Sequence, residues 1–228
     1  MKRALLEELQ RARADHVPVA LVTDLNDGTQ GLVYDDHVVA AELPLGSSHT
    51  LEIRELLRTA RSAMLADSEL FIRSYVPAYR LLIVGAVHIA QALATLAIEC
   101  GYQVTVIDPR RAFATDQRFH NVQLCAEWPD EAMARLAPDA QTAVVTLAHD
   151  PKIDDPALIA ALNSNAFYIG ALGSRRTHSK RVERLTEQGL QDKLERIHAP
   201  IGLNLGGRSH AEIAVAILAQ LIQARYSG

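Results

Sequence analysis

The sequence predicts an α/β protein: a Rossmann-like parallel sheet with helices on both faces, preceded by a small N-terminal α+β lobe. From about residue 79, apolar runs of strand length alternate with helical stretches, which predicts right-handed βαβ units. The runs at 81–84 and 143–147 are apolar at nearly every position, as expected for strands that helices cover on both faces. The first part of the chain lacks this alternation. We therefore expect two domains, residues 1–78 and residues 79–228.

The N-terminal lobe is predicted to contain two helices and a pair of strands. Residues 1–15 read as an amphipathic charged helix, and the turn-prone Asn26-Asp27-Gly28 separates strand-like runs at 17–25 and 31–43. A second helix is expected over residues 49–66. The residues expected on its buried side are Leu51, Leu56, Leu57 and Met64.

The larger domain begins after an expected hinge at residues 74–80, which contain Pro77. Its predicted strands are residues 80–86, 102–109, 121–125, 142–148 and 166–172. Its predicted helices begin at residues 89, 129, 156, 174 and 209. Ligands of such sheets bind outside the carboxyl ends of the strands, where loops and helix N-termini converge. Four segments with glycine or polar residues fall at that edge.

The composition limits the classes of function. The formal net charge of −4 gives no general attraction for nucleic acid or for an anionic membrane. Cys100 and Cys125 are far from a CxxC spacing, so no zinc or thioredoxin-like site is expected. The charged N-terminus lacks the apolar core of a signal peptide, and no run approaches the length of a membrane span. We expect a cytoplasmic, reduced protein.

The first segment at the carboxyl edge is Gly85-Ala86-Val87-His88, between a strand and a helix. With Ala90 it follows the Gly-x-Gly-x-x-Gly/Ala frame of dinucleotide-binding loops, except that Val87 stands where the middle glycine belongs. That glycine lets a pyrophosphate approach the backbone, whereas a valine adds a branched side chain and disfavours a positive φ. The segment is therefore either a ligand-binding loop or a tight strand–helix turn without a ligand.

The second segment begins with Asp108, at the end of the next predicted strand. A carboxylate there can accept both hydroxyls of a ribose. The neighbouring Arg110 and Arg111 offer positive charge to a phosphate, which favours a phosphorylated ribose or another anionic ligand. A solvated Asp–Arg turn is the alternative.

The third segment contains His149 and Asp150, directly after a predicted strand. Histidine and carboxylates together suit acid–base or metal chemistry. Asp154 and Asp155, however, precede the predicted helix, where acids serve as caps and as partners of the helix dipole. We therefore predict no metal ligand and no catalytic residue here, and we assign His149-Asp150 to a binding site.

The fourth segment is Gly173-Ser174-Arg175-Arg176, at the start of a helix. Ser174 can cap the helix, and free N–H groups, the positive helix end and two guanidinium groups together suit a phosphate. A basic solvated helix face is the alternative, because the series continues with Lys180, Arg181 and Arg184. Further on, Ser209 and Glu212 form a capping box for the closing helix.

Four stretches of the larger domain resemble one known family, the C-terminal domain of the XdhC/CoxI proteins. They are residues 81–110, 146–158, 168–185 and 196–222. Members of this family are maturation factors for xanthine and carbon monoxide dehydrogenases. The resemblance implies a Rossmann-like domain that binds the molybdenum cofactor (molybdopterin) and delivers it to an apo molybdenum hydroxylase. It further implies cytoplasmic work, a homodimer and contact with a cofactor sulfurase.

The sequence departs from the family pattern at three places. Val87 breaks the usual Gly-Ala-Gly-His loop, and Ser209-His210-Ala211-Glu212 replaces the usual Thr-Pro-Glu-Glu. The N-terminal lobe is short and lacks both the family's cysteine and its Gly-Ser-x-Pro-Arg segment. Cofactor binding by an N-terminal cysteine, which the family pattern implies, is therefore not expected for this protein.

Three functions are compatible with these observations. The first is a non-catalytic maturation factor. The second is an NAD(P)-binding oxidoreductase, which the Rossmann frame and Asp108 favour but which lacks a Tyr-x-x-x-Lys pair. The third is a regulatory protein that binds no ligand. The predicted cofactor-binding residues are Gly85, Ala86, Val87, His88, Asp108, Arg110, His149, Asp150, Gly173, Ser174, Arg175 and Arg176.

Overall fold

The computed structural model describes residues 2–39, 43, 45–110 and 112–227. The chain divides into two compact units, Met1–Pro77 and Ala78–Gly228. Each unit has its own sheet and its own apolar core. Among the described residues, no helix is long and apolar enough to cross a bilayer.

The first unit is an antiparallel sheet with a helix on each face. Its strand order is β3-β2-β1-β5-β4. Its strands are β1 (Val19–Asp24), β2 (Gln30–Val33), β3 (Val38–Val39), β4 (Ala63–Met64) and β5 (Leu70–Tyr75), and its helices are α1 (Arg3–Ala14) and α2 (Ser47–Arg58). Successive side chains of a strand point to opposite faces. Accordingly, Leu21 of β1 packs in the α1 cluster with Leu9, while Val22 packs in the α2 cluster with Ile53.

This unit confirms the predicted turn and corrects the predicted second helix. Gly28, with φ +77°, lies in the tight connection between β1 and β2. α2 ends at Arg58 instead of residue 66, because Ala60 adopts φ +53° and the chain turns into β4. Met64 therefore lies in a strand and Leu51 is exposed, so neither is the core residue that we predicted.

The first sheet also contains a strand that we did not predict. β5 pairs antiparallel with β1 along its whole length, from Leu70 opposite Asp24 to Tyr75 opposite Val19. The predicted strand at 31–43 is divided into β2 and β3. Its residues 40–42 lie outside the described residues.

The second unit confirms the predicted Rossmann-like sheet. Its strands are all parallel, in the order β11-β10-β9-β6-β7-β8. They are β6 (Arg80–Val84), β7 (Gln103–Ile107), β8 (Gln123–Cys125), β9 (Thr142–Thr146), β10 (Tyr168–Ala171) and β11 (Ile197–His198). β6, the first of them, lies in the middle, and the chain builds outward on one side before it crosses to the other, which is the Rossmann order.

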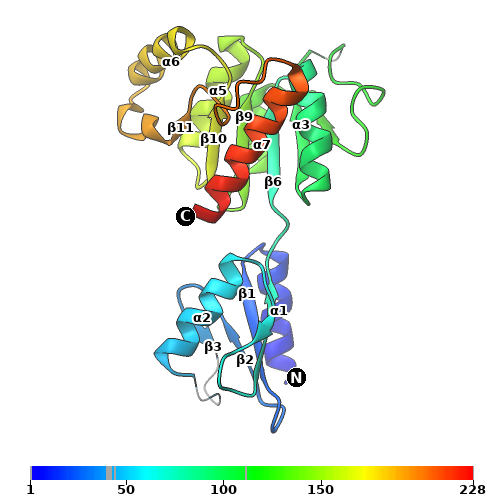
Figure 1. Ribbon diagram of the computed structural model, residues 1–228, viewed down its shortest axis with the longest axis vertical. Helices are drawn as coiled ribbons and strands as arrows, with labels where there is room; N and C mark the ends of the chain where they lie inside the picture. The colour runs from blue at the N-terminus through cyan, green and yellow to red at the C-terminus, as the bar shows by residue number, and fades with distance from the viewer. Residues whose placement is uncertain (1, 40–42, 44, 111, 228) are drawn as a thin grey trace. The chain divides into compact units, whose positions relative to one another are not determined.

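Helices cover both faces of the parallel sheet, as predicted. They are α3 (His88–Glu99), α4 (Pro129–Leu136), α5 (Pro151–Leu162), α6 (Arg175–Glu187) and α7 (His210–Ser227), with a 3₁₀ helix at Gln191–Arg196. α3 and α7 lie side by side on one face (Figure 1), where Leu93 and Ile217 share a core cluster. α4 and α5 cover the other face through Met133 and Leu158.

The direction in which successive strands are added to the sheet reverses between β6 and β9, which are neighbours in the sheet. The chain continues from β6 toward β7 on one side and from β9 toward β10 on the other. The carboxyl ends of β6 and β9 therefore form the switch point at which parallel α/β sheets bind ligands.

Candidate functional site

The loops after β6 and β9 touch at the switch point. Gly85 has φ +105°, a conformation that favours glycine. A Cβ atom on this residue would lie 2.6 Å from the nitrogen of Ala148, so there is also no room for a side chain. The N–H of Leu147 donates to the carbonyl of Val84 at 2.8 Å. The structure therefore brings the predicted glycine loop and the predicted His149 loop into direct contact.

Asp108 is buried and hydrogen-bonded to its own chain. Its Oδ2 accepts from the Ala86 N–H and from Arg110 Nη2, both at 2.8 Å. Its Oδ1 accepts from the backbone N–H and from Nε of Arg110, at 3.0 and 2.9 Å. Burial raises the pKa of Asp108, but the hydrogen bonds from Arg110 and Ala86 outweigh burial and hold the pKa below its ordinary value. A ribose would have to displace Arg110 to reach this carboxylate.

Arg110 presents a positive charge at the rim of the site. Its side chain is 37% exposed, and its guanidinium lies 4.6 Å from the ring centroid of Phe113. The hydrogen bonds to Asp108 raise the pKa of Arg110, so its guanidinium stays protonated near neutral pH. Arg111, its predicted neighbour in phosphate binding, lies outside the described residues.

α3 begins at the switch point without a side-chain cap. Val87 is its N-cap residue, with φ −87° and ψ 175°. This is extended backbone that any residue adopts, so the backbone strain that we predicted for a valine here is wrong. In the described part of the chain no side chain accepts from the first N–H groups of α3. An uncapped helix N-terminus favours a bound anion, because its N–H groups and the helix dipole both attract negative charge.

A second histidine joins His88 at this helix end. His88 opens α3 and stacks on His210, which opens α7, with ring centroids 5.3 Å apart and planes 14° apart. The capping box of α7 is confirmed: Glu212 Oε2 accepts from the Ser209 N–H at 2.9 Å, and Ser209 Oγ accepts from the Glu212 N–H at 3.2 Å. We did not predict a role for His210, because the sequence signal at this position was the capping box alone.

His149 and Asp150 lie between β9 and α5. His149 is exposed and adopts φ +60°, an uncommon conformation for a residue other than glycine. Asp150 caps α5, and its Oδ1 accepts from the Lys152 N–H at 3.0 Å. In the described residues, no group of three or more His, Cys, Asp or Glu side chains is arranged to hold a metal ion.

α5 starts earlier than predicted, at Pro151, so Asp154 and Asp155 lie within the helix instead of before it. Asp154 is only 2% exposed, and its Oδ1 accepts from the Ala148 N–H at 3.2 Å. Burial raises the pKa of Asp154 to about 6. The side chain that we read as a cap or dipole partner of the helix is thus a buried contact of the switch-point loop.

Ser174 caps α6 as predicted, since its Oγ accepts from the Thr177 N–H at 3.2 Å. Arg175 and Arg176 follow in the first turn and are exposed. They stand at the end of β10, two strands from β6, which is roughly 10 Å at the usual strand spacing. A single elongated ligand can span that distance.

The basic series does not continue along α6 as a uniform solvated face. Arg181 is 2% exposed and donates from Nη2 to the carbonyl of Leu172 at 2.9 Å. Arg184 donates from Nη2 to Asp155 Oδ1 at 2.9 Å. Lys180, which lies between the first turn and these two arginines, is exposed.

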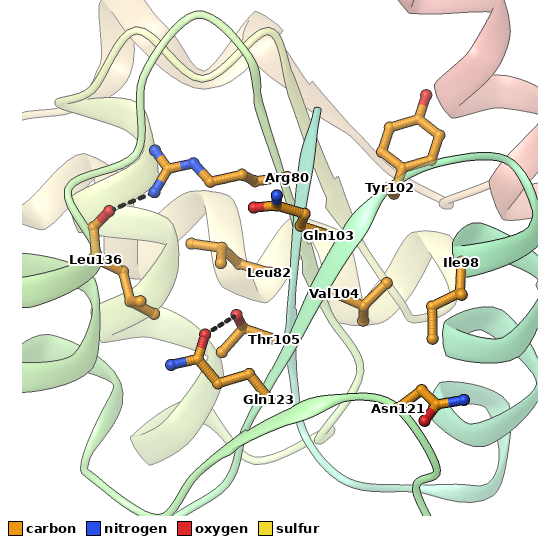
Figure 2. Close-up of a pocket in the computed structure, with 10 residues that line it drawn as sticks. All are labelled: Arg80, Leu82, Ile98, Tyr102, Gln103, Val104, Thr105, Asn121, Gln123 and Leu136. Carbon is orange, nitrogen blue, oxygen red and sulfur yellow. Dashed lines mark hydrogen bonds between the residues drawn. The ribbon is translucent and has the colours of Figure 1, made fainter. Parts of the chain in front are cut away.

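A separate pocket of about 410 Å³ lies at the amino ends of β6 and β7. Figure 2 shows its polar side chains, of which Arg80 donates to the carbonyl of Leu136 at 2.7 Å and Thr105 donates to Gln123 Oε1 at 3.3 Å. These bonds fix the end of α4 and the start of β8. None of the predicted site residues lines this pocket.

The fold and the edge of the sheet define a class of protein. A Rossmann sheet with an uncapped helix N-terminus at its switch point, and with arginines at the neighbouring strand ends, is typical of domains that bind nucleotide-like or phosphorylated ligands. A model of the XdhC Rossmann domain matches residues 81–221. The chain belongs to this family.

The relatives are consistent with that assignment. The chain is 34% identical over 150 residues to the molybdenum cofactor insertion chaperone PaoD of Escherichia coli (strain K12), which is 65% of this chain and 41% of that protein. It is 30% identical over 159 residues to a Bacillus subtilis (strain 168) protein named as a probable xanthine dehydrogenase component, which is 69% of this chain and 46% of that protein. The chain thus covers less than half the length of either relative.

A crystal structure of a Bacillus halodurans protein described as a xanthine dehydrogenase shares the fold. It superposes with a TM-score of 0.73 over 99% of this chain and 68% of that chain. The sequence identity is 23%, so this likeness concerns the fold alone.

Proposed function

We propose that this protein binds the molybdenum cofactor at the carboxyl edge of its parallel sheet and assists its insertion into a molybdenum hydroxylase. The observation that carries the proposal is membership of the XdhC family, of which a 34% identical relative is a molybdenum cofactor insertion chaperone. The proposed client is an apo-enzyme such as xanthine or carbon monoxide dehydrogenase. A cofactor sulfurase and a second copy of the chain are further proposed partners, and the cytoplasm is the proposed location.

The donor set at this edge fits such a cargo. Molybdopterin is a flat, polar heterocycle that carries a phosphate, and its nucleotide forms carry a pyrophosphate. The uncapped start of α3 and the first turn of α6, with Arg175 and Arg176, offer N–H groups and guanidinium groups to phosphate oxygens. The stacked rings of His88 and His210 offer a flat surface to a heterocycle.

In this proposal the residues bind and orient the cargo and catalyse no reaction. Arg110 contributes a fixed positive charge, because Asp108 raises its pKa and holds its guanidinium by two hydrogen bonds. The exposed Arg175 and Arg176 lie at an open rim, which suits a ligand that is received and passed on. Release to the client would require only that the client offer stronger contacts to the same phosphate.

An NAD(P)-binding oxidoreductase is the second candidate, because the strand order and the Gly85 frame are those of dinucleotide-binding folds. Two observations disfavour it. The oxygens of Asp108 are hydrogen-bonded to Arg110 and Ala86, which leaves them occupied where a ribose would bind. The Ala86 N–H is likewise taken by Asp108, so the loop offers fewer donors to a pyrophosphate.

Reconstitution of a client enzyme tests the proposal. Charge-assisted hydrogen bonds contribute about 1.5–3 kcal/mol each when sheltered, so Arg175→Ala with Arg176→Ala should weaken molybdopterin binding at least roughly tenfold. Apo xanthine dehydrogenase supplied with molybdopterin and this variant should recover less activity than with the wild-type chain. Lys180→Ala, on the exposed part of the same helix, is the matched control and should reconstitute like the wild type. Equal recovery with wild type, double variant and no added chain would contradict the proposal.

A further inference from the structure

Two oppositely charged side chains are buried behind the candidate site. They are Asp154 of α5 and Arg181 of α6, each 2% exposed. Burial raises the pKa of Asp154 and lowers the pKa of Arg181, which means that the fold disfavours the charge of both. Buried charges of this kind seldom add stability compared with apolar residues of similar size. Their presence therefore calls for a role other than stability.

Asp154 holds the loop after β9. Its Oδ1 accepts from the Ala148 N–H at 3.2 Å, and hydrogen bonds from the backbone of Ala148 and His149 act against the effect of burial on its pKa. Ala148 is the residue that abuts Gly85, and His149 is the one with φ +60°. A loop with a non-glycine residue in the left-handed region persists only when its surroundings impose that conformation. Asp154 supplies part of that constraint.

Arg181 holds the loop after β10. Its side chain runs back along α6, and Nη2 donates to the carbonyl of Leu172 at 2.9 Å. The N–H of Leu172 donates in turn to the carbonyl of Thr146, at the end of β9, at 2.9 Å. Leu172 directly precedes Gly173 and the cap residue Ser174. Arg181 thus fixes the strand end from which the arginine-bearing turn of α6 starts.

We propose that Asp154 and Arg181 are positioning residues, and that they hold the loops after β9 and β10 in the arrangement that binds the anionic cargo. Each side chain reaches a different loop: Asp154 accepts from the Ala148 N–H after β9, and Arg181 donates to the Leu172 carbonyl after β10. The link to cargo rests on the proposed function. The loop arrangement itself is measurable without any ligand.

Amide hydrogen exchange tests the positioning role alone. Asp154→Leu removes the charge and the acceptor while it keeps a similar side-chain volume. Exchange of the amides at 147–150 should accelerate at least about tenfold in this variant, because their conformation loses a constraint. Asp155→Leu is the matched control, since Asp155 lies on the same helix but pairs with Arg184 of α6 in a half-buried contact away from residues 147–150. Exchange at 147–150 should not change in the control.

The affinity of the full chain for molybdopterin, measured by equilibrium dialysis, tests the link to function. Asp154→Leu and Arg181→Met should each lower the affinity at least about fivefold. The double variant should bind more weakly than either single variant, because it releases both loops. Asp154→Asn keeps shape and one acceptor, so it should fold and give an intermediate loss.

The outcomes separate the two proposals. Unchanged exchange and unchanged affinity in the folded Asp154→Asn and Asp154→Leu variants would overturn the positioning role, and so would equal effects in the Asp155→Leu control. If the wild-type chain binds no molybdopterin, the proposed function fails. Accelerated exchange confined to the Asp154 and Arg181 variants would still support the positioning role in that case.

Discussion

Gly85 and Asp154 both lie against the backbone nitrogen of Ala148. A Cβ on Gly85 would lie 2.6 Å from the Ala148 nitrogen, and the N–H on that nitrogen donates to Asp154. Backbone atoms cannot move aside as the end of a flexible side chain can, so single-residue changes at these two positions act on the whole switch point. A substitution at either position should therefore change the stability of the larger unit.

Gly85→Ala should be among the most destabilising substitutions of the larger unit. Left-handed backbone costs an alanine about 1–2 kcal/mol, and the clash with Ala148 adds overpacking, so we expect a loss of about 3 kcal/mol or more in the free energy of unfolding. Gly189→Ala is the matched control, since Gly189 has φ +75° but no atom within 4 Å of the added Cβ. Urea denaturation of both variants measures the difference. Equal losses would show that the contact with Ala148 does not matter.

Asp154→Asn should remove a pH dependence of stability. Burial raises the pKa of Asp154 from 3.8 to about 6, so between these values the folded protein keeps a proton that the unfolded chain releases. This stabilisation is present in full below pH 3.8 and is lost as the pH rises through 6. The free energy of unfolding of the wild type, minus that of the variant, should fall by up to about 3 kcal/mol across this range. A difference that stays constant with pH would contradict the burial of this charge.

The helix ends of the second unit differ in how they are capped. Asp150, Ser174 and Ser209 accept hydrogen bonds from the first turns of α5, α6 and α7. α3, which starts at the switch point, has Val87 as its N-cap residue and no side-chain cap. Because Val87 already has the extended backbone of an N-cap, a capping side chain could replace it without backbone strain.

Val87→Asn and Val87→Asp should therefore separate helix stability from ligand binding. Either substitution supplies an acceptor and should stabilise the protein by about 1 kcal/mol. The aspartate also places a negative charge where the proposed phosphate binds, so it should weaken molybdopterin binding much more than the neutral asparagine does. Thermal denaturation and equilibrium dialysis measure the two effects. Equal affinity in both variants would place the phosphate elsewhere.

At the scale of the whole molecule, the regular alternation of strands and helices after residue 79 is enough to predict the parallel sheet, but not the strand order that puts the switch point between β6 and β9. Three strands escape prediction: β4 and β5 of the lobe, and β11 at the edge of the parallel sheet. β4 and β11 have only two residues each, and the end of β5 overlaps the start of the expected hinge at residues 74–80. Short or punctuated segments gain their strand conformation from pairing with neighbours, which the local sequence does not record.

In the candidate site, too, features that depend on nearby residues in the sequence are predictable, and features that depend on packing are not. Ser174 and the Ser209–Glu212 box are predictable because a cap depends on residues three or four positions apart. The burial of Arg181 is not predictable, because its neighbours in α6 are mostly charged and its burial depends on how α6 packs against α5 and the 3₁₀ helix. The stacking of His210 on His88 likewise depends on the contact between α3 and α7, two helices from opposite ends of the domain.

We propose above that this chain binds the molybdenum cofactor at the carboxyl edge of its sheet. Titration of the purified full chain with molybdopterin, alongside NADPH, tests it most directly. We expect saturable molybdopterin binding that weakens as ionic strength rises and that NADPH does not compete with. The affinity should fall at least about tenfold with Arg175→Ala and Arg176→Ala. Saturable binding of NADPH without any binding of molybdopterin would contradict the claim and favour the oxidoreductase.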